Sequence, residues 1–150
     1  MLPKEIMISV IDGQGGGIGK SIINKLRKLI DKGGGISICA LGTNSTATNN
    51  MIKAGADFGA TGENAITVTA YKSDIILGPI AIIAANSMLG ELTPAMAAAV
   101  STCSALKILV PLNRCNIMIA SELGCTTEAY IDNSIRMVMD YLYSDKQDMV

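Results

Sequence analysis

The sequence predicts an α/β fold in which helices cover both faces of a mostly parallel sheet. Apolar runs typical of buried strands alternate with segments whose apolar residues recur at helical spacing. Each connection between the first five predicted strands contains one helix-forming segment, as parallel strands require. A glycine-rich segment, residues 13–19, separates the first apolar run from the first helical segment. Together these observations favour a doubly wound sheet.

The elements are expected in the following order. Strands are predicted at 6–11, 36–41, 57–61, 74–77 with a possible extension to 80, 107–111 and 116–120. Helices are predicted at 18–30, 43–54, 63–72, 95–103 and 127–143. Gly33, Gly34 and Gly35 end the first helix, and Thr93 followed by Pro94 starts the fourth. The whole chain, 1–150, is therefore predicted to be one Rossmann-like doubly wound domain of five to six strands in the order 3-2-1-4-5.

The composition limits both the core and the partners. Of the 150 residues, 49% are hydrophobic but only 3% are aromatic, so aliphatic side chains and methionine must build the core. A mean hydropathy of +0.40 predicts more apolar surface than a monomer needs, and we therefore expect a homo-oligomer. A net charge of −1, with so few aromatic residues, argues against binding to nucleic acid.

The cysteines and the apolar runs argue against a zinc protein and a membrane protein. The longest apolar run, 75–85, contains Gly78 and Pro79 and is too short to span a bilayer, so no membrane partner is expected. The chain has no His and its four Cys residues lack Cys-x-x-Cys spacing, which argues against a zinc site. Free thiols, with no signal peptide before the first strand, predict a cytoplasmic protein.

The most informative segment, 12–21, reads Asp-Gly-Gln-Gly-Gly-Gly-Ile-Gly-Lys-Ser. Glycines let backbone N–H groups approach an anion without an intervening Cβ, and the helix that follows directs its positive end at the charge. A turn needed only for packing is the alternative interpretation. We predict a phosphate cradle made by Gly13, Gln14, Gly15, Gly16, Gly17, Ile18, Gly19 and Lys20.

Two common nucleotide-binding templates fail here, because both require glycine where Gln14 stands. The spacing Gly13-x-x-x-Gly17-Ile18-Gly19 instead resembles the glycine loop of short-chain dehydrogenases, with Asp12 where those proteins usually carry threonine. That resemblance implies a tight turn at Gly13, a close approach of pyrophosphate at Gly17 and close helix-to-strand contact at Gly19. However, no carboxylate for a ribose follows the second strand, and no Tyr-x-x-x-Lys pair occurs.

Polar residues gather where the predicted strands end. Ligands of parallel sheets bind beyond the carboxyl ends of the strands, near the point where strand order reverses, so a cleft is expected there. Arg114 is expected to clamp an anion, while Asp12 and Glu63 are candidate general bases or water-mediated ligands of Mg²⁺. The segment 84–92 is expected to form a lid or a subunit contact. Besides the glycine loop, the expected cleft includes Thr43, Asn44, Gly62, Asn64, Gly78, Pro79, Asn113 and Arg114.

Several longer motifs resemble one family. They lie at 12–19, 40–44, 54–56, 61–65, 78–80, 85–91 and 111–116. From the first strand to about Ile119 the chain is similar to a family of short bacterial proteins classed as a domain of unknown function. The resemblance implies a cytoplasmic single-domain protein with a Rossmann-like fold, and it transfers no catalytic residue.

These observations favour a nucleotide- or dinucleotide-binding protein, with NAD(P) or an adenine nucleotide as the suspected phosphate-containing ligand. Two alternatives stay open. The first is a small enzyme acting on a phosphorylated or carboxylated metabolite, in which Arg114 and the loop hold the anion and Asp12 or Glu63 moves a proton. The second is a structural homo-oligomer that binds no small molecule and uses its Gly- and Ala-rich segments for packing.

Overall fold

The computed structural model describes residues 4–112, 115–120 and 125–144, and it contains one five-stranded parallel sheet. The strand order β3-β2-β1-β4-β5 confirms the predicted order. The strands are β1 (Ile6–Asp12), β2 (Ile36–Gly42), β3 (Phe58–Thr61), β4 (Ile75–Pro79) and β5 (Leu106–Val110). The helices are α1 (Gly17–Leu29), α2 (Ser45–Lys53), α3 (Glu63–Ala70), α4 (Pro94–Thr102) and α5 (Thr127–Tyr143). Two short 3-10 helices, η1 (Ile80–Ile83) and η2 (Met88–Gly90), lie between β4 and α4.

The sixth strand predicted at 116–120 is wrong. Those residues form no strand, and β5 pairs with β4 as the last strand of the sheet. Cys115 and Asn116 have positive φ angles of 57° and 58°, which is left-handed rather than extended backbone. The chain therefore turns immediately before the apolar segment that suggested a strand, and Met118 within that segment is 86% exposed.

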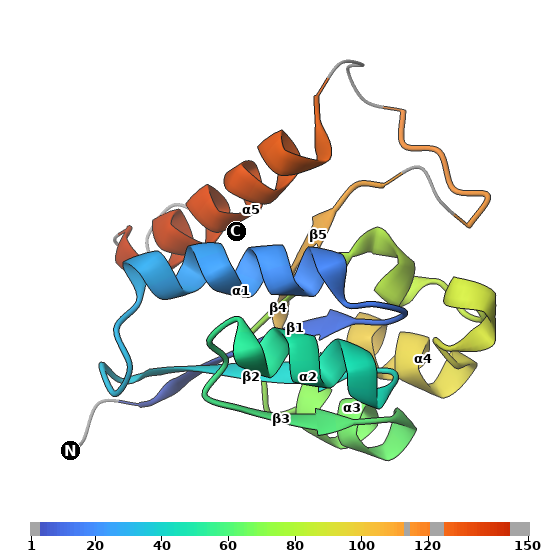
Figure 1. The fold of residues 1–150 in the computed structure, drawn as a ribbon, viewed down its shortest axis with the longest axis horizontal. Helices are drawn as coiled ribbons and strands as arrows, with labels where there is room; N and C mark the ends of the chain where they lie inside the picture. Colours follow the sequence, from blue (N-terminus) through green and yellow to red (C-terminus); the bar gives the residue numbers. More distant parts are fainter. Residues whose placement is uncertain (1–3, 113–114, 121–124, 145–150) are drawn as a thin grey trace.

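Helices cover both faces of the sheet, as Figure 1 shows. Buried residues of α1, α2 and α5 pack on one face, and residues of α3, α4, η1 and η2 pack on the other. This arrangement follows from the right-handed connections of parallel strands, since the chain must change face where it returns from β3 to β4. The change of direction separates the segments after β1 and β4, and leaves space between them at the edge of the sheet.

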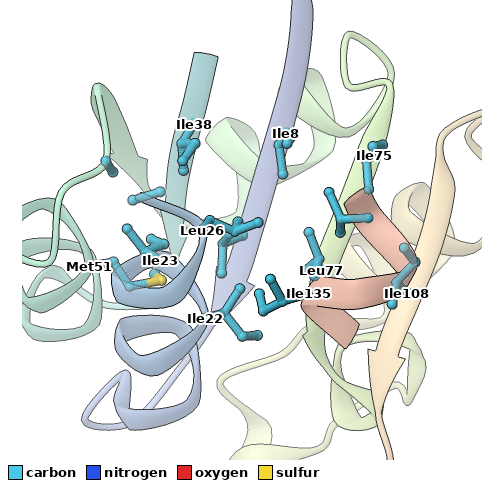
Figure 2. Close-up of a cluster of buried hydrophobic side chains, with 14 of the residues drawn as sticks. Ile8, Ile22, Ile23, Leu26, Ile38, Met51, Ile75, Leu77, Ile108 and Ile135 are labelled. Atoms are coloured by element: carbon cyan, nitrogen blue, oxygen red, sulfur yellow. The ribbon is translucent and has the colours of Figure 1, made fainter. Parts of the chain in front are cut away.

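The core on the α1 face is aliphatic. In Figure 2, Ile22, Ile23 and Leu26 of α1 lie between the sheet, Met51 of α2 and Ile135 of α5. All three α1 residues are completely buried, which matches the helical spacing seen in the sequence. The burial of α1 against the two central strands fixes the start of the helix, and the glycine-rich loop before it, relative to the sheet.

One ion pair fastens α1 to the next part of the sheet. Asp57 Oδ2 accepts hydrogen bonds from Arg27 Nη2 at 2.8 Å and from Ile38 N at 2.7 Å, and Arg27 Nε donates to the Gly55 carbonyl at 2.9 Å. Burial opposes ionisation of Asp57, but the hydrogen bonds and the Arg27 charge hold the pKa of the carboxyl below its usual value. Arg27 thus serves packing of α1 against the segment before β3.

Candidate functional site

The carboxyl ends of the strands meet at one edge of the sheet. In register, Asp12 lies opposite Gly42, Gly42 opposite Thr61, and Pro79 opposite Val110. Strand order reverses between β1 and β4, so ligand binding is expected between the segments that follow these two strands. Figure 1 shows the segments after β1, β4 and β5 at this same edge.

Two adjoining hollows lie at this reversal point. The switch-point cavity has a volume of about 90 Å³ and is lined by Asp12, Gly13, Gln14, Ile18, Pro79, Ile80, Ala81, Met88, Leu112 and Cys115. The outer pocket has a volume of about 520 Å³ and is lined by Gln14, Ala84, Ala85, Asn86, Ser87, Met88, Leu89, Cys115 and Asn116. The two share Gln14, Met88 and Cys115. Of these two hollows, only the outer pocket has a volume within the range of roughly 300–1,000 Å³ that small-molecule sites occupy.

Unfavourable backbone conformations concentrate around the outer pocket. In the described part of the chain, the six non-glycine residues with positive φ are Gln14, Asn86, Met88, Leu89, Cys115 and Asn116. Every one of them lines the outer pocket. A non-glycine residue in such a conformation costs on the order of 1–3 kcal/mol, and the surrounding structure keeps that strain most often at functional sites. The strained residues therefore lie where the strand order reverses between β1 and β4, which is also where ligand binding is expected.

Asp12 braces the glycine-rich loop. Its Oδ1 accepts a hydrogen bond from Gly13 N and its Oδ2 accepts one from Gly19 N, both at 2.8 Å. The side chain is 5% exposed, so the carboxylate links the end of β1 to the first turn of α1 from inside the protein. The residue expected to be a general base therefore makes contacts that shape the loop.

The start of α1 holds three backbone N–H groups that are unpaired among the described residues. Among the described residues, the N–H groups of Gly15, Gly17 and Ile18 donate to no partner. The neighbouring N–H groups are engaged, because Gly16 N donates to the Gly13 carbonyl and Lys20 N donates to the Gly16 carbonyl. The unpaired groups lie at the positive end of the helix dipole, where an anion is favoured.

The glycines of the loop differ in what a side chain would meet. A Cβ at Gly13 would lie 2.5 Å from Met88 Sδ, and one at Gly19 would lie 2.4 Å from Met51 Sδ and 3.1 Å from Asp12 Cβ. Gly16 has a φ of 70°, and its Cβ would lie 2.9 Å from Ala47 Cα. A Cβ at Gly15 or at Gly17 would have no neighbouring heavy atom within 4 Å. Packing thus requires some of these glycines, whereas Gly15 and Gly17 border open space.

Glu91, which the sequence analysis did not identify, lines neither hollow but contacts the glycine-rich loop and the end of β2. Its Oε1 accepts hydrogen bonds from Gln14 N at 3.1 Å, Thr43 Oγ1 at 2.9 Å and Asn44 Nδ2 at 2.5 Å. Partial burial opposes ionisation, but these three hydrogen bonds lower the pKa of the Glu91 carboxyl below its ordinary value. In the sequence, Glu91 is only a carboxylate in the segment after β4, and nothing there indicates that its side chain reaches the end of β2.

Thr43 and Asn44 lie at this edge but bond within the protein. Thr43 donates to Glu91, and Asn44 Oδ1 accepts from Ala47 N at 2.9 Å, which caps α2. Asn44 Nδ2 also donates to the Gln14 carbonyl at 2.9 Å. Asn44, which was expected to contact a ligand, therefore holds the glycine-rich loop against the end of β2.

The remaining predicted residues divide between the site and its surroundings. Pro79 lines the switch-point cavity, Gly78 lies in β4 just before it, and Lys20 is exposed in the first turn of α1. Residues at the end of the outer strand β3, which lies two strands from β1, line neither hollow: Gly62, Glu63 and Asn64. Asn113 and Arg114 lie outside the described residues, although Leu112 and Cys115 on either side of them both line the switch-point cavity.

The described residues lack both a metal-binding cluster and a membrane-spanning helix. They contain no group of three or more His, Cys, Asp or Glu side chains placed to hold a metal ion. Among the same residues, no helix is both long enough and apolar enough to cross a membrane.

Comparison with known proteins identifies the family. The model of a domain of unknown function, DUF3842, matches residues 7–143, so the chain belongs to that family. A comparison with curated proteins finds no match. Among solved structures, the chain is similar to the crystal structure of a dodecameric FMN-dependent Ubix-like decarboxylase from Escherichia coli O157:H7. The TM-score is 0.47 at 14% identity, with 91% of this chain and 93% of that chain covered.

Proposed function

We propose that this member of the DUF3842 family binds a nucleotide or dinucleotide, with the phosphates on the glycine-rich loop at residues 13–19. One observation carries the proposal: three backbone N–H groups, of Gly15, Gly17 and Ile18, have no partner among the described residues. They lie at the amino end of α1, beside the switch-point cavity that Ile18 lines. Phosphate oxygens would satisfy these donors and interact with the helix dipole.

The hollows beside the loop support a ligand larger than inorganic phosphate. The switch-point cavity is lined mainly by apolar residues such as Ile80 and Ala81, which suits the flat ring of a base or nicotinamide. The wider outer pocket adjoins it through Gln14, Met88 and Cys115. NAD(P) or an adenine nucleotide therefore remains the proposed ligand.

No described residue favours the enzyme alternative over binding alone. Both carboxylate oxygens of Asp12 accept backbone hydrogen bonds, and Glu63 lies at the start of α3, away from the hollows. We therefore assign no residue to proton transfer. The expected homo-oligomer stays a prediction, for which Leu89, 99% exposed at the rim of the outer pocket, is the best-placed contact.

A thermal-shift screen tests the proposed function. We expect at least one of NAD(H), NADP(H), ATP, ADP, GTP, flavins or simple phosphates to stabilise the purified protein, with or without Mg²⁺. A ligand present at a hundred times its Kd adds about 2.7 kcal/mol of stability, which corresponds to a rise in Tm of roughly 5–10 °C for a chain of this size. A flat screen at millimolar ligand would reject the proposal and favour the structural oligomer.

A further inference from the structure

We propose that Glu91 recognises the ribose of the nucleotide and selects a free 2′-hydroxyl over a 2′-phosphate. This inference rests on the proposed function, which it deepens by assigning the ribose subsite. In doubly wound folds that bind dinucleotides, an acidic residue at the end of the second strand accepts the ribose hydroxyl hydrogen bonds. Here the second strand ends at Gly42 and is followed by Thr43 and Asn44, so that segment offers no carboxylate.

Glu91 brings a carboxylate to that same place from another part of the chain. It follows η2 in the segment between β4 and α4, yet its Oε1 accepts hydrogen bonds from the side chains of Thr43 and Asn44. It also accepts one from Gln14 N, so the carboxylate lies between the glycine-rich loop and the end of β2. This is the relative position that a ribose carboxylate needs when phosphates lie at the start of α1.

The hydrogen bonds leave half of the carboxylate available. Oε1 accepts all three hydrogen bonds, whereas Oε2 has no hydrogen-bond partner among the described residues. No described cation forms an ion pair with Glu91, so its charge is not neutralised within that part of the chain. An ionised carboxylate only accepts hydrogen bonds, which suits the hydroxyl donors of a ribose.

The same charge disfavours a phosphorylated ribose. A phosphate on the 2′-hydroxyl would bring a second negative group next to Glu91, in a partly buried site where water screens the repulsion less than at the surface. It would also remove the hydroxyl donor that the carboxylate accepts. Both effects act in the same direction, so NAD⁺ is expected to bind more tightly than NADP⁺.

Calorimetric titration with NAD⁺, NADP⁺ and inorganic pyrophosphate tests the inference. Wild-type protein is expected to bind NAD⁺ at least tenfold more tightly than NADP⁺. Glu91→Gln, which keeps the size of the side chain, is expected to reduce that preference at least fivefold while pyrophosphate affinity changes less than threefold. Glu5→Gln is the matched control, because Glu5 is exposed just before β1 at the opposite edge of the sheet, and the preference should persist.

The possible failures are distinguishable. Equal or tighter binding of NADP⁺ to wild-type protein would overturn the role of Glu91 without affecting the phosphate cradle, and this comparison needs no variant. If Glu91→Gln strengthened binding of all three probes equally, Glu91 would be only a charge competing with phosphate, which also overturns the inference. No binding of any of the three probes to wild-type protein would overturn the inference, whereas the proposed function is overturned only if the thermal-shift screen is flat as well.

Discussion

Gly78→Ala is expected to lower the free energy of unfolding by about 3 kcal/mol, at the upper end of the cost of overpacking a core. A Cβ at Gly78 would lie 2.3 Å from the Ile11 carbonyl oxygen and 3.0 Å from Ile82 Cδ1. The Ile82 side chain can turn away, but the carbonyl belongs to β1 in the centre of the sheet. Relief of the clash therefore requires β1 and β4 to separate just beyond their last paired residues, Val10 and Leu77. Chemical denaturation measures the loss.

Gly34→Ala is the control for that experiment. A Cβ at Gly34 would meet only the Asp31 carbonyl, at 3.5 Å, which is an ordinary contact. Its effect on the free energy of unfolding is expected to stay within about 0.5 kcal/mol, as for most surface substitutions. A loss below about 1 kcal/mol for Gly78→Ala would show that β1 and β4 adjust easily, contrary to the close approach of Gly78 to the Ile11 carbonyl.

Gly17→Val is expected to weaken nucleotide binding at least a hundredfold while the protein remains folded. Nothing lies within 4 Å of a Cβ at Gly17, so the fold has room for the side chain. The bound phosphate is proposed to approach the N–H groups of Gly17 and Ile18, and a branched side chain on the first residue of α1 would hinder that approach. Calorimetric titration with the nucleotide found by the thermal-shift screen gives the change in Kd.

Gly34→Val is the matched control for Gly17→Val. Both positions are glycines with negative φ and without close neighbours, but Gly34 precedes β2 at the opposite edge of the sheet. The nucleotide affinity of Gly34→Val is expected to equal that of wild-type protein within a factor of two. An affinity of Gly17→Val within threefold of wild type would instead place the phosphate somewhere other than the glycine-rich loop.

The sheet was predictable because its signals are local. Apolar runs, helical spacing and the Thr93-Pro94 helix start each depend on neighbouring residues, and right-handed connections then restrict the strand order. The glycine-rich segment 13–19 was predictable for the same reason, since it follows one strand and precedes one helix. The fold class and the location of the loop therefore follow from short-range pattern and connectivity.

The contacts around the loop were not predictable from such patterns. The Glu91 contacts depend on the path of the 84–92 segment, where Asn86, Met88 and Leu89 adopt left-handed conformations that methionine and leucine rarely prefer. The same kind of turn at Cys115 and Asn116 ends the expected sixth strand before it starts. Packing by distant segments, rather than the residue type, determines where the backbone adopts a strained conformation. Local sequence pattern therefore does not predict these positions.

The most direct test of the phosphate cradle is an amide-resolved NMR titration of the wild-type protein with ADP. We expect the N–H signals of Gly15, Gly17 and Ile18 to shift most and to saturate together, because these are the donors proposed to bind the phosphates. The N–H of Gly13 should change little, since it already donates to Asp12. Saturable shifts confined to other parts of the sheet edge, or no shifts at millimolar ADP, would contradict phosphate binding by the glycine-rich loop.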